Sequence, residues 1–519
     1  MLGSHLREKA RFLLSFKQFL FCLRTSVTSG KMVMLFIGVL FSQQTASKYT
    51  IPQHATTTTK TEGVGQEGEG VRKKTNKPLY ITSSSSFQYE YAVVIDAGST
   101  GSRIHVYQFK RKPNELLIDI DFRNEKYYKF KPGLSSFDKS SLTSHEIAQY
   151  FSPLLNYARE HVPMQMRSKT PLYVLATAGM RKVRERNPQM AATIMRICAE
   201  ELKKTEFIVH EQWVRIIEGR DEGLWGWITA NYLNGEIQNA VKLGSPFKAR
   251  TRGVLEMGGE SLQISFIPPP QQLSKIPSQY VTRVDIGSVV FPIFTHSYMG
   301  LGMEAAQGKL DMYLANNGHK DESPCYLRGD ERDYIHEQIT WRGKGNFDEC
   351  YQHLNQLVDT KKCPIDALGH GEDGSLEGRV FTCTPNGILM PHISNDLAFY
   401  WIENFYYTAR VLNIDSIDGK SFLQVLKEKG RSFCALDKTF ASQQFPGAST
   451  EEIAKVRVFF FGHTCFCAAW LSVMIDNGFS LAEFNNYQVI RDINEVGIDW
   501  ALGFLVQHSN DALTQTSMV

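Results

Sequence analysis

Two stretches of the sequence place a carboxylate directly before small residues. Asp96 precedes the run from Gly98 to Ser102 (Gly98, Ser99, Thr100, Gly101, Ser102), and Glu256 precedes Gly258, Gly259 and Ser261. Glycines let a ligand approach the backbone, turn amides form an anion nest, and hydroxyls add donors. A carboxylate beside bound phosphates usually indicates a divalent cation, held directly or through its water shell. Both stretches therefore favour phosphate binding with Ca²⁺ or Mg²⁺.

Each stretch lies between two expected strands. Apolar residues 91–95 and 253–255 lead into the acids, and the alternating runs 102–109 and 262–266 follow the small residues. A single Gly/Ser-rich hairpin turn is more often only a turn. Two turns with one layout, 160 residues apart, indicate two related lobes that face each other.

Two further segments lie between these hairpins. Residues 170–183 predict a buried strand that breaks at Thr177-Ala178-Gly179 into a helix, and residues 218–235 predict a turn and then a helix with Glu222 near its start. The first could be an ordinary strand-to-helix turn, with Arg181 on the surface or in a salt bridge. Glu222 could instead be an ordinary acidic residue of the kind that the helix dipole favours in the first turn of a helix.

These segments, in this order, resemble the apyrase family, the nucleoside triphosphate diphosphohydrolases. The resemblance covers about residues 88–507 and includes these motifs: Asp96 to Arg103, Ala176 to Arg181, Asp221-Glu222-Gly223 with Trp227 and Asn231 to Leu233, Met257 to Gly259 with Ser261 and Gln263, and Trp500 to Gly503. It implies an α/β, actin-like (ribonuclease H-like) two-lobe ATPase fold with the nucleotide in the cleft between the lobes. The implied lobe I is 88–218 plus 489–519, and lobe II is 219–488.

The resemblance also implies hydrolysis of the terminal phosphate of nucleoside tri- and diphosphates, without a phosphoenzyme. Glu222 would be the general base, and Ser261 and Gln263 would orient the attacking water. The implied phosphate ligands are Gly98, Ser99, Thr100, Gly101, Ser102, Thr177, Ala178, Gly258 and Gly259. The residues expected to hold Ca²⁺ or Mg²⁺, mostly through water, are Asp96, Glu256, Thr177 and Trp500.

The chain departs from the family pattern in two places. The family has aspartate where this chain has Glu256, and the extra methylene moves the carboxylate by about 1 Å, which can cost ~100-fold in rate. Glu260 and Leu262 stand where a small residue and threonine are usual, and Glu260 adds negative charge near a phosphate site. We expect these changes to affect activity rather than the fold.

The aromatic segment 399–412 also matches the family. We expect most of its aromatic side chains to lie in the core of lobe II. Phe405, Tyr406 or Tyr407 could instead stack on the nucleotide base.

The cysteines indicate an oxidising compartment. There are nine; Cys22 falls in the N-terminal segment, Cys198 is expected to be a buried thiol, and seven follow residue 320. Short loops would be closed by the pairs Cys325–Cys350, Cys363–Cys383 and Cys434–Cys465. The alternative is a set of free buried thiols.

The N-terminus predicts entry into the secretory pathway, with a secreted or luminal Golgi or endo-lysosomal product. The apolar run 32–41 follows basic residues and precedes small residues suited to cleavage near Ala46, so residues 1–47 read as a signal peptide or an uncleaved anchor. Residues 48–87 are polar, Gly-rich and charged, and read as a disordered linker. A membrane would be a partner only if the anchor is retained.

Composition narrows the possible partners. The formal net charge of +3 gives no global basic field for nucleic acid, so the expected partners are nucleoside tri- and diphosphates. Three alternatives to an apyrase are an exopolyphosphatase of the same superfamily, a catalytically weak nucleotide-binding protein and, with less support, a sugar kinase.

Overall fold

A computed structural model describes most of the chain after residue 88. The described residues are 89–112, 115–124, 126–139, 141–319, 321–334, 339–363, 380–415, 417, 419–444 and 461–509. All of them belong to one compact unit, Ser83–Val519. The segments 1–47 and 48–87, with Cys22, lie outside them. Among the helices of the described ranges, none combines the length and the apolar character that crossing a bilayer requires.

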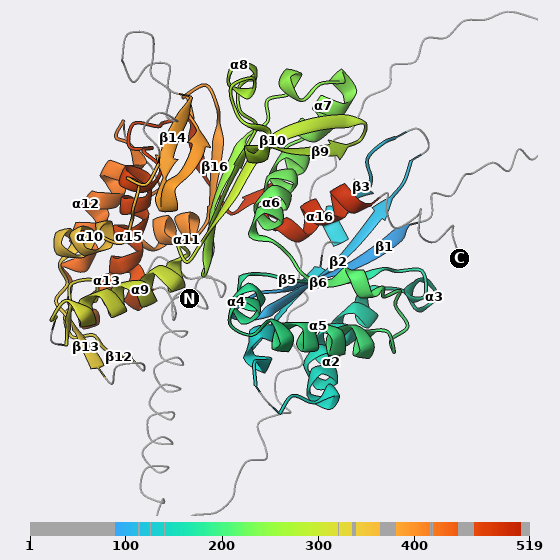
Figure 1. Ribbon diagram of the computed structural model, residues 1–519, viewed down its shortest axis with the longest axis horizontal. Coiled ribbons are helices and arrows are strands. Elements are labelled where there is room, and N and C mark those ends of the chain that lie inside the picture. Colours follow the sequence, from blue (N-terminus) through green and yellow to red (C-terminus); the bar gives the residue numbers. More distant parts are fainter. Residues whose placement is uncertain are drawn as a thin grey trace, which may run out of the picture. The chain divides into compact units, whose positions relative to one another are not determined.

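The first sheet carries the N-terminal hairpin (Figure 1). Its strand order is β3-β2-β1-β5-β6, with β4 also paired to β2; β1 and β2 are antiparallel, and β5 runs parallel to β1. The strands are β1 Glu90–Ala97, β2 Ser102–Lys110, β3 Asp119–Ile120, β4 Lys126–Phe130, β5 Leu172–Ala176 and β6 Val214–Ile216.

Helices cover both faces of this sheet. One face packs on α2 Ser144–His161, α4 Ala178–Arg186 and α5 Pro188–Leu202. The other face packs on α6 Gly219–Leu233 and α16 Trp500–His508. Because both faces are covered, β1 is a continuous apolar run rather than an alternating one.

The second sheet repeats this arrangement. Its order is β17-β16-β7-β8-β10-β9, where β7 and β8 form a hairpin and β16 runs parallel to β7. The strands are β7 Gly253–Met257, β8 Ser261–Phe266, β9 Thr282–Ile286, β10 Val289–Met299, β16 Phe399–Glu403 and β17 Tyr487–Val489. Its core includes side chains of α9 Met303–Asn316, α10 Phe347–Asn355, α11 Asn404–Val411, α12 Phe422–Cys434 and α15 Thr464–Val473.

Helices α6 and α16 lie against each other between the two sheets (Figure 1). They pack closely because Gly503 of α16 has no side chain; a Cβ there would collide with the carbonyl of Trp225 in α6. Thr229 of α6 reinforces the contact, donating to the Asp499 carbonyl at 2.7 Å and accepting from the Gly503 amide at 2.8 Å. This helix pair is therefore a rigid connection from which residues of both helices can reach the space between the hairpins.

The remaining α-helices and β-strands are short. They are α3 Met164–Arg167, α7 Glu236–Leu243, α8 Pro270–Leu273, α13 Lys438–Gln444, β11 Glu322–Ser323, β12 Glu331–Tyr334, β13 Ile339–Gly343, β14 Phe381–Thr384, β15 Ile388–Pro391, β18 Asp492–Ile493 and β19 Val496–Gly497. The three predicted disulfides are confirmed: Cys325–Cys350, Cys363–Cys383 and Cys434–Cys465. Cys198 is a buried free thiol as expected, and so is Cys467.

Candidate active site

The first loop, residues 98–101 between β1 and β2, is packed against glycines from elsewhere in the chain. A Cβ on Gly179, in the first turn of α4, would lie 2.7 Å from Ser99 Cα, and one on Gly133 would collide with the Ser99 carbonyl. The Thr177 amide donates to the Ala97 carbonyl at 3.1 Å, which ties the end of β5 to the start of the loop. Small residues are therefore required around this loop as well as in it.

The second loop, residues 258–260 between β7 and β8, is fixed in an analogous way. A Cβ on Gly302, the residue before α9, would collide with the loop backbone at Glu260. The Glu304 amide donates to the Gly259 carbonyl at 2.8 Å. Asn404, at the start of α11, donates to the Met257 carbonyl at 2.6 Å. As in the first lobe, the strand parallel to the hairpin is followed by a residue that holds the loop.

Both loops line one cavity of about 150 Å³. The predicted site residues that line it are Asp96, Gly98, Ser99, Thr100, Gly101, Thr177, Ala178, Glu222, Glu256, Gly258, Gly259, Ser261 and Trp500. The two hairpins, whose acids Asp96 and Glu256 are 160 positions apart in the chain, therefore meet at one small polar site, as the duplicated pattern led us to expect.

Four predicted residues do not line the cavity. Ser102 is fully buried, and its Oγ lies 2.5 Å from the Tyr150 hydroxyl in the core of the first lobe. Phe405 is completely buried against Trp401, which leaves no exposed ring face for a base. Tyr406 is half-buried on α11 and contacts Tyr407.

Gln263 is the fourth, and it lies directly behind the cavity. Its amide nitrogen donates to Ser261 Oγ at 2.6 Å and to Ser297 Oγ at 3.1 Å. Because Ser261 and Gln263 are two residues apart on β8, they share one face of the sheet. Gln263 thus orients the Ser261 hydroxyl, which itself lines the cavity.

Glu222 lies in the first turn of α6 and faces the cavity. Its carboxylate accepts from Arg181 at 3.0 Å, and the two side chains are only 13% and 5% exposed. Arg181 also donates to the Ile217 carbonyl at 3.2 Å. Burial raises the pKa of Glu222, while Arg181 opposes this rise. The sequence analysis left Arg181 either on the surface or in a salt bridge. The structure shows the salt bridge, and its partner is the predicted base Glu222.

The other acids of the cavity differ in how far hydrogen bonds and positive charges offset their negative charge. Asp96 Oδ1 is buried and has no hydrogen-bond partner among the described residues. Burial and the nearby Asp499 raise the pKa of Asp96, and burial with Glu403 raises that of Glu256. Buried carboxylates without sufficient counter-charge are costly. The donor set therefore fits a divalent cation with oxygen ligands.

Asp499 is the exception among these acids. It accepts from Arg103 at 2.5 Å and lies 3.3 Å from His105 Nε2, and it caps α16 by accepting from the Ala501 amide. Burial alone would raise the pKa of Asp499, but His105 and Arg103 hold it well below the ordinary value. The Asp499 carboxylate thus anchors Arg103 beside the cavity that both residues line.

Comparison with known proteins identifies the family. A profile of the GDA1/CD39 (nucleoside phosphatase) family matches residues 82–518. The chain belongs to this family. It is 27% identical over 453 residues to bovine ectonucleoside triphosphate diphosphohydrolase 1, covering 81% of each chain. It is also 27% identical to human nucleoside diphosphate phosphatase ENTPD5, covering 84% of this chain and 90% of that one.

A solved structure confirms the predicted actin-like fold. The nucleoside triphosphate hydrolase structure from Neospora caninum superposes with a TM-score of 0.57 at 15% identity, covering 82% of this chain and 93% of that one. This likeness agrees with the two related sheets and the helix pair between them. The chain therefore has the two-lobe α/β fold.

The two departures from the family pattern are accommodated locally. Gly226 of α6 leaves room for the longer Glu256 side chain, because a Cβ there would lie 3.3 Å from Glu256 Oε2. Glu260 forms an ion pair with Lys182 of α4, so its charge is compensated by the opposite lobe. Neither residue disrupts the loops.

Sequence reasoning missed four charged residues of the cavity: Arg103, Lys129, Glu403 and Asp499. Glu403 ends β16 with φ 57° and ψ −118°, a backbone conformation that costs ~1–3 kcal/mol outside glycine and is typical of functional sites. A signal existed, because Glu403 closes an apolar strand just as Asp96 and Glu256 do. The interpretation of 399–412 as an aromatic segment obscured it.

Proposed function

We propose that this protein hydrolyses the terminal phosphoanhydride bond of nucleoside di- and triphosphates, with Glu222 as the general base. The observation that carries the proposal is one small cavity that two glycine-rich loops and a buried glutamate line together. Membership of the nucleoside phosphatase family and the names of the two relatives support the same reaction class.

In this mechanism the amides of the first loop and of Thr177-Ala178 hold the terminal phosphate, and the second loop closes on its other side. Ser261, oriented by Gln263, positions a water molecule near Glu222. As the water oxygen forms its bond to phosphorus, Glu222 takes its proton, and the bond to the bridging oxygen breaks. Charge spreads over the transferred phosphoryl oxygens, so positioned donors do most of the work.

Asp96 and Glu256 are the residues that would hold Ca²⁺ or Mg²⁺, mostly through water, with Thr177 and Trp500 nearby. When bound, the cation would neutralise phosphate charge. The orphaned Asp96 oxygen supports this assignment.

The cavity is large enough to enclose only part of the substrate. About 150 Å³ suits a phosphate group with its cation and water, whereas pockets for whole small-molecule ligands are usually ~300 Å³ or more. The nucleoside would therefore extend out of the cavity. With Phe405 buried, Tyr406 and Tyr407 remain the proposed stacking residues for the base.

We further propose that the protein works in the secretory pathway. Three disulfides are typical of an oxidising compartment, and one relative carries the prefix "ecto" in its name.

The test is phosphate release from a panel of nucleoside di- and triphosphates and inorganic polyphosphate, with Ca²⁺, Mg²⁺ or EDTA. We expect cation-dependent release from nucleotides and none with EDTA. Turnover of polyphosphate alone, or binding without turnover, would contradict the proposal.

A further inference from the structure

Three potential metal ligands meet in the second lobe, away from the residues that line the cavity. Glu349 and His353 are one turn apart on α10, and His319 follows the end of α9. An i,i+4 spacing places Glu349 and His353 on one helix face. No step of the proposed reaction uses these residues.

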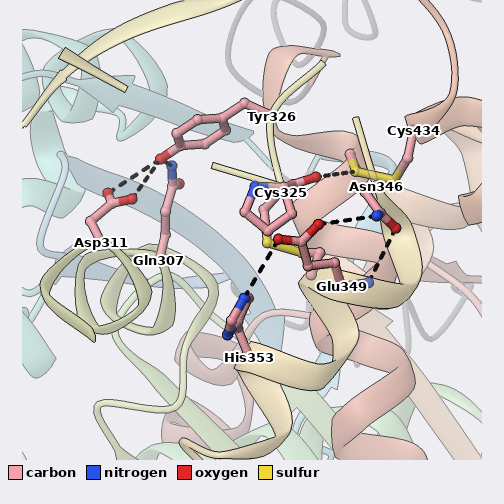
Figure 2. The surroundings of a disulfide bond; sticks show 11 residues. Gln307, Asp311, Cys325, Tyr326, Asn346, Glu349, His353 and Cys434 are labelled. Carbon is pink, nitrogen blue, oxygen red and sulfur yellow. Dashed lines mark hydrogen bonds and ion pairs between the residues drawn. A yellow bond between two sulfur atoms is a disulfide. The ribbon is translucent and has the colours of Figure 1, made fainter. Parts of the chain in front are cut away.

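The ligand atoms of the three side chains all lie within 4.8 Å of one another. His353 Nε2 is 3.9 Å from Glu349 Oε1, and Figure 2 shows this imidazole and carboxylate facing each other along α10. The His319 and His353 rings meet edge to face, with centroids 4.7 Å apart. All three residues are half-buried, so they are partly desolvated and still reachable from solvent.

The backbone beneath these side chains is held firmly. Cys350, between Glu349 and His353, is disulfide-bonded to Cys325. Asn346 caps α10 by accepting from the Glu349 amide at 3.2 Å, and its side chain also donates to Glu349 Oε2 at 3.1 Å. Glu349 Oε1 is the oxygen that faces His353.

The groups around the cluster leave it available for a cation. Lys344 Nζ lies 3.5 Å from Glu349 Oε1, but the Lys344 side chain is 41% exposed and can turn into solvent. Tyr313 packs against the His353 ring.

We propose that His319, Glu349 and His353 form a binding site for a divalent transition metal of the zinc class. Two imidazole nitrogens and one carboxylate oxygen are a typical Zn²⁺ donor set, with a water in the fourth position. Ca²⁺ and Mg²⁺ prefer all-oxygen ligands, so the cation proposed for the catalytic cavity would not compete well here. The bound metal would tie the end of α9 to α10.

The test is Zn²⁺ binding to the disulfide-bonded protein, purified without a histidine tag, by titration calorimetry in excess Ca²⁺ that occupies the acidic cavity. His319→Gln and His353→Gln remove one ligand each, and His145→Gln, an exposed histidine on α2, is the matched control. We expect one Zn²⁺ site in the wild type and in His145→Gln, and affinity at least ~10-fold weaker in each cluster variant.

Thermal unfolding gives a second readout that does not depend on turnover. A hundredfold excess of Zn²⁺ over its Kd should raise the wild-type Tm by ~2 °C or more, and this rise should be absent in His353→Gln. Wild type without a zinc site, or cluster variants that bind Zn²⁺ as tightly as His145→Gln does, would overturn the proposal. Nucleotide hydrolysis should be unchanged in both cluster variants in the absence of Zn²⁺, so this test is independent of the proposed reaction.

Discussion

The two hairpins share a backbone plan but differ in the side chains paired across their strands. In the first lobe, cross-strand pairing sets Asp96 opposite Arg103, and Arg103 opposite Lys129. In the second lobe, it sets Glu256 opposite Gln263, and Gln263 opposite Ser297. One row is an acid with two cations, and the other is an acid with an amide and a hydroxyl.

The strands that run parallel to the hairpins, β5 and β16, also differ in the residue at their ends. β5 ends on Ala176, opposite Ala97, whereas β16 ends on Glu403, opposite Met257. The second lobe therefore adds a carboxylate where the first has a methyl group. We interpret the first row as the side of the cavity that binds phosphate through its two cations, and the second row as the side that orients water. The acid of each row, Asp96 or Glu256, would hold the metal ion.

The largest expected effect is that of Glu222→Gln, because Glu222 belongs to neither row and is the proposed base. Turnover should fall at least ~100-fold while nucleotide binding persists. Glu218→Gln is the matched control, since Glu218 precedes the same helix and pairs with the exposed Arg184. Near-normal turnover of Glu222→Gln would show that one of the rows supplies the base.

Exchanging the two acids tests the asymmetry directly. Asp96→Glu should cost ~100-fold in kcat/KM, because the carboxylate moves by about 1 Å next to a tightly packed loop. Glu256→Asp should leave activity within about threefold or raise it. The space beside Gly226 shows that the site tolerates the longer glutamate side chain, but it does not show that catalysis needs it. A severe loss in Glu256→Asp would mean that the second row has adapted to glutamate. Steady-state kinetics of both variants decide this.

The sequence predicted the loops better than their supports. Asp96, Glu256 and the glycines were recognisable because an acid and a turn end an apolar strand, which is a local pattern. Arg103 stood in the recognised motif without a role, since its partner Asp499 lies 396 residues away. Long-range partners of this kind do not follow from a single sequence.

Burial was equally hard to foresee for individual side chains. Ser102 has the same residue type as Ser99, but it is the first residue of β2 and is paired with Tyr150, whereas Ser99 lies in the turn. Phe405 and Tyr406 are neighbours on α11, yet only Phe405 lies in the core. Helix phase decides between them, and the apolar content of the segment did not reveal it.

Replacing the glycines that pack against each loop by alanine should separate the roles of the two loops. Gly179→Ala would push on Ser99, and Gly302→Ala on the backbone at Glu260. Each should destabilise the protein by ~1–3 kcal/mol. If the interpretation of the rows is right, Gly179→Ala mainly raises KM, and Gly302→Ala mainly lowers kcat by displacing Ser261.

Gly308→Ala in α9 is the control for these variants, because a Cβ there meets no atom within 4 Å. It should leave kinetics unchanged. Equal effects of Gly179→Ala and Gly302→Ala on KM and kcat would contradict a division of labour between the loops.

The smallest expected effect is a shift in pH dependence on replacing Arg181 by methionine. The base acts only when deprotonated, so turnover falls as the pH drops through the pKa of Glu222. Arg181 counteracts the rise in that pKa caused by burial, and its removal raises the pKa further. The acid limb of the kcat profile should therefore move to higher pH. Arg181→Lys should restore part of the shift, and Arg184→Met, an exposed neighbour, should cause none. An acid limb that Arg181→Met leaves in place would mean that a carboxylate of one of the rows controls it.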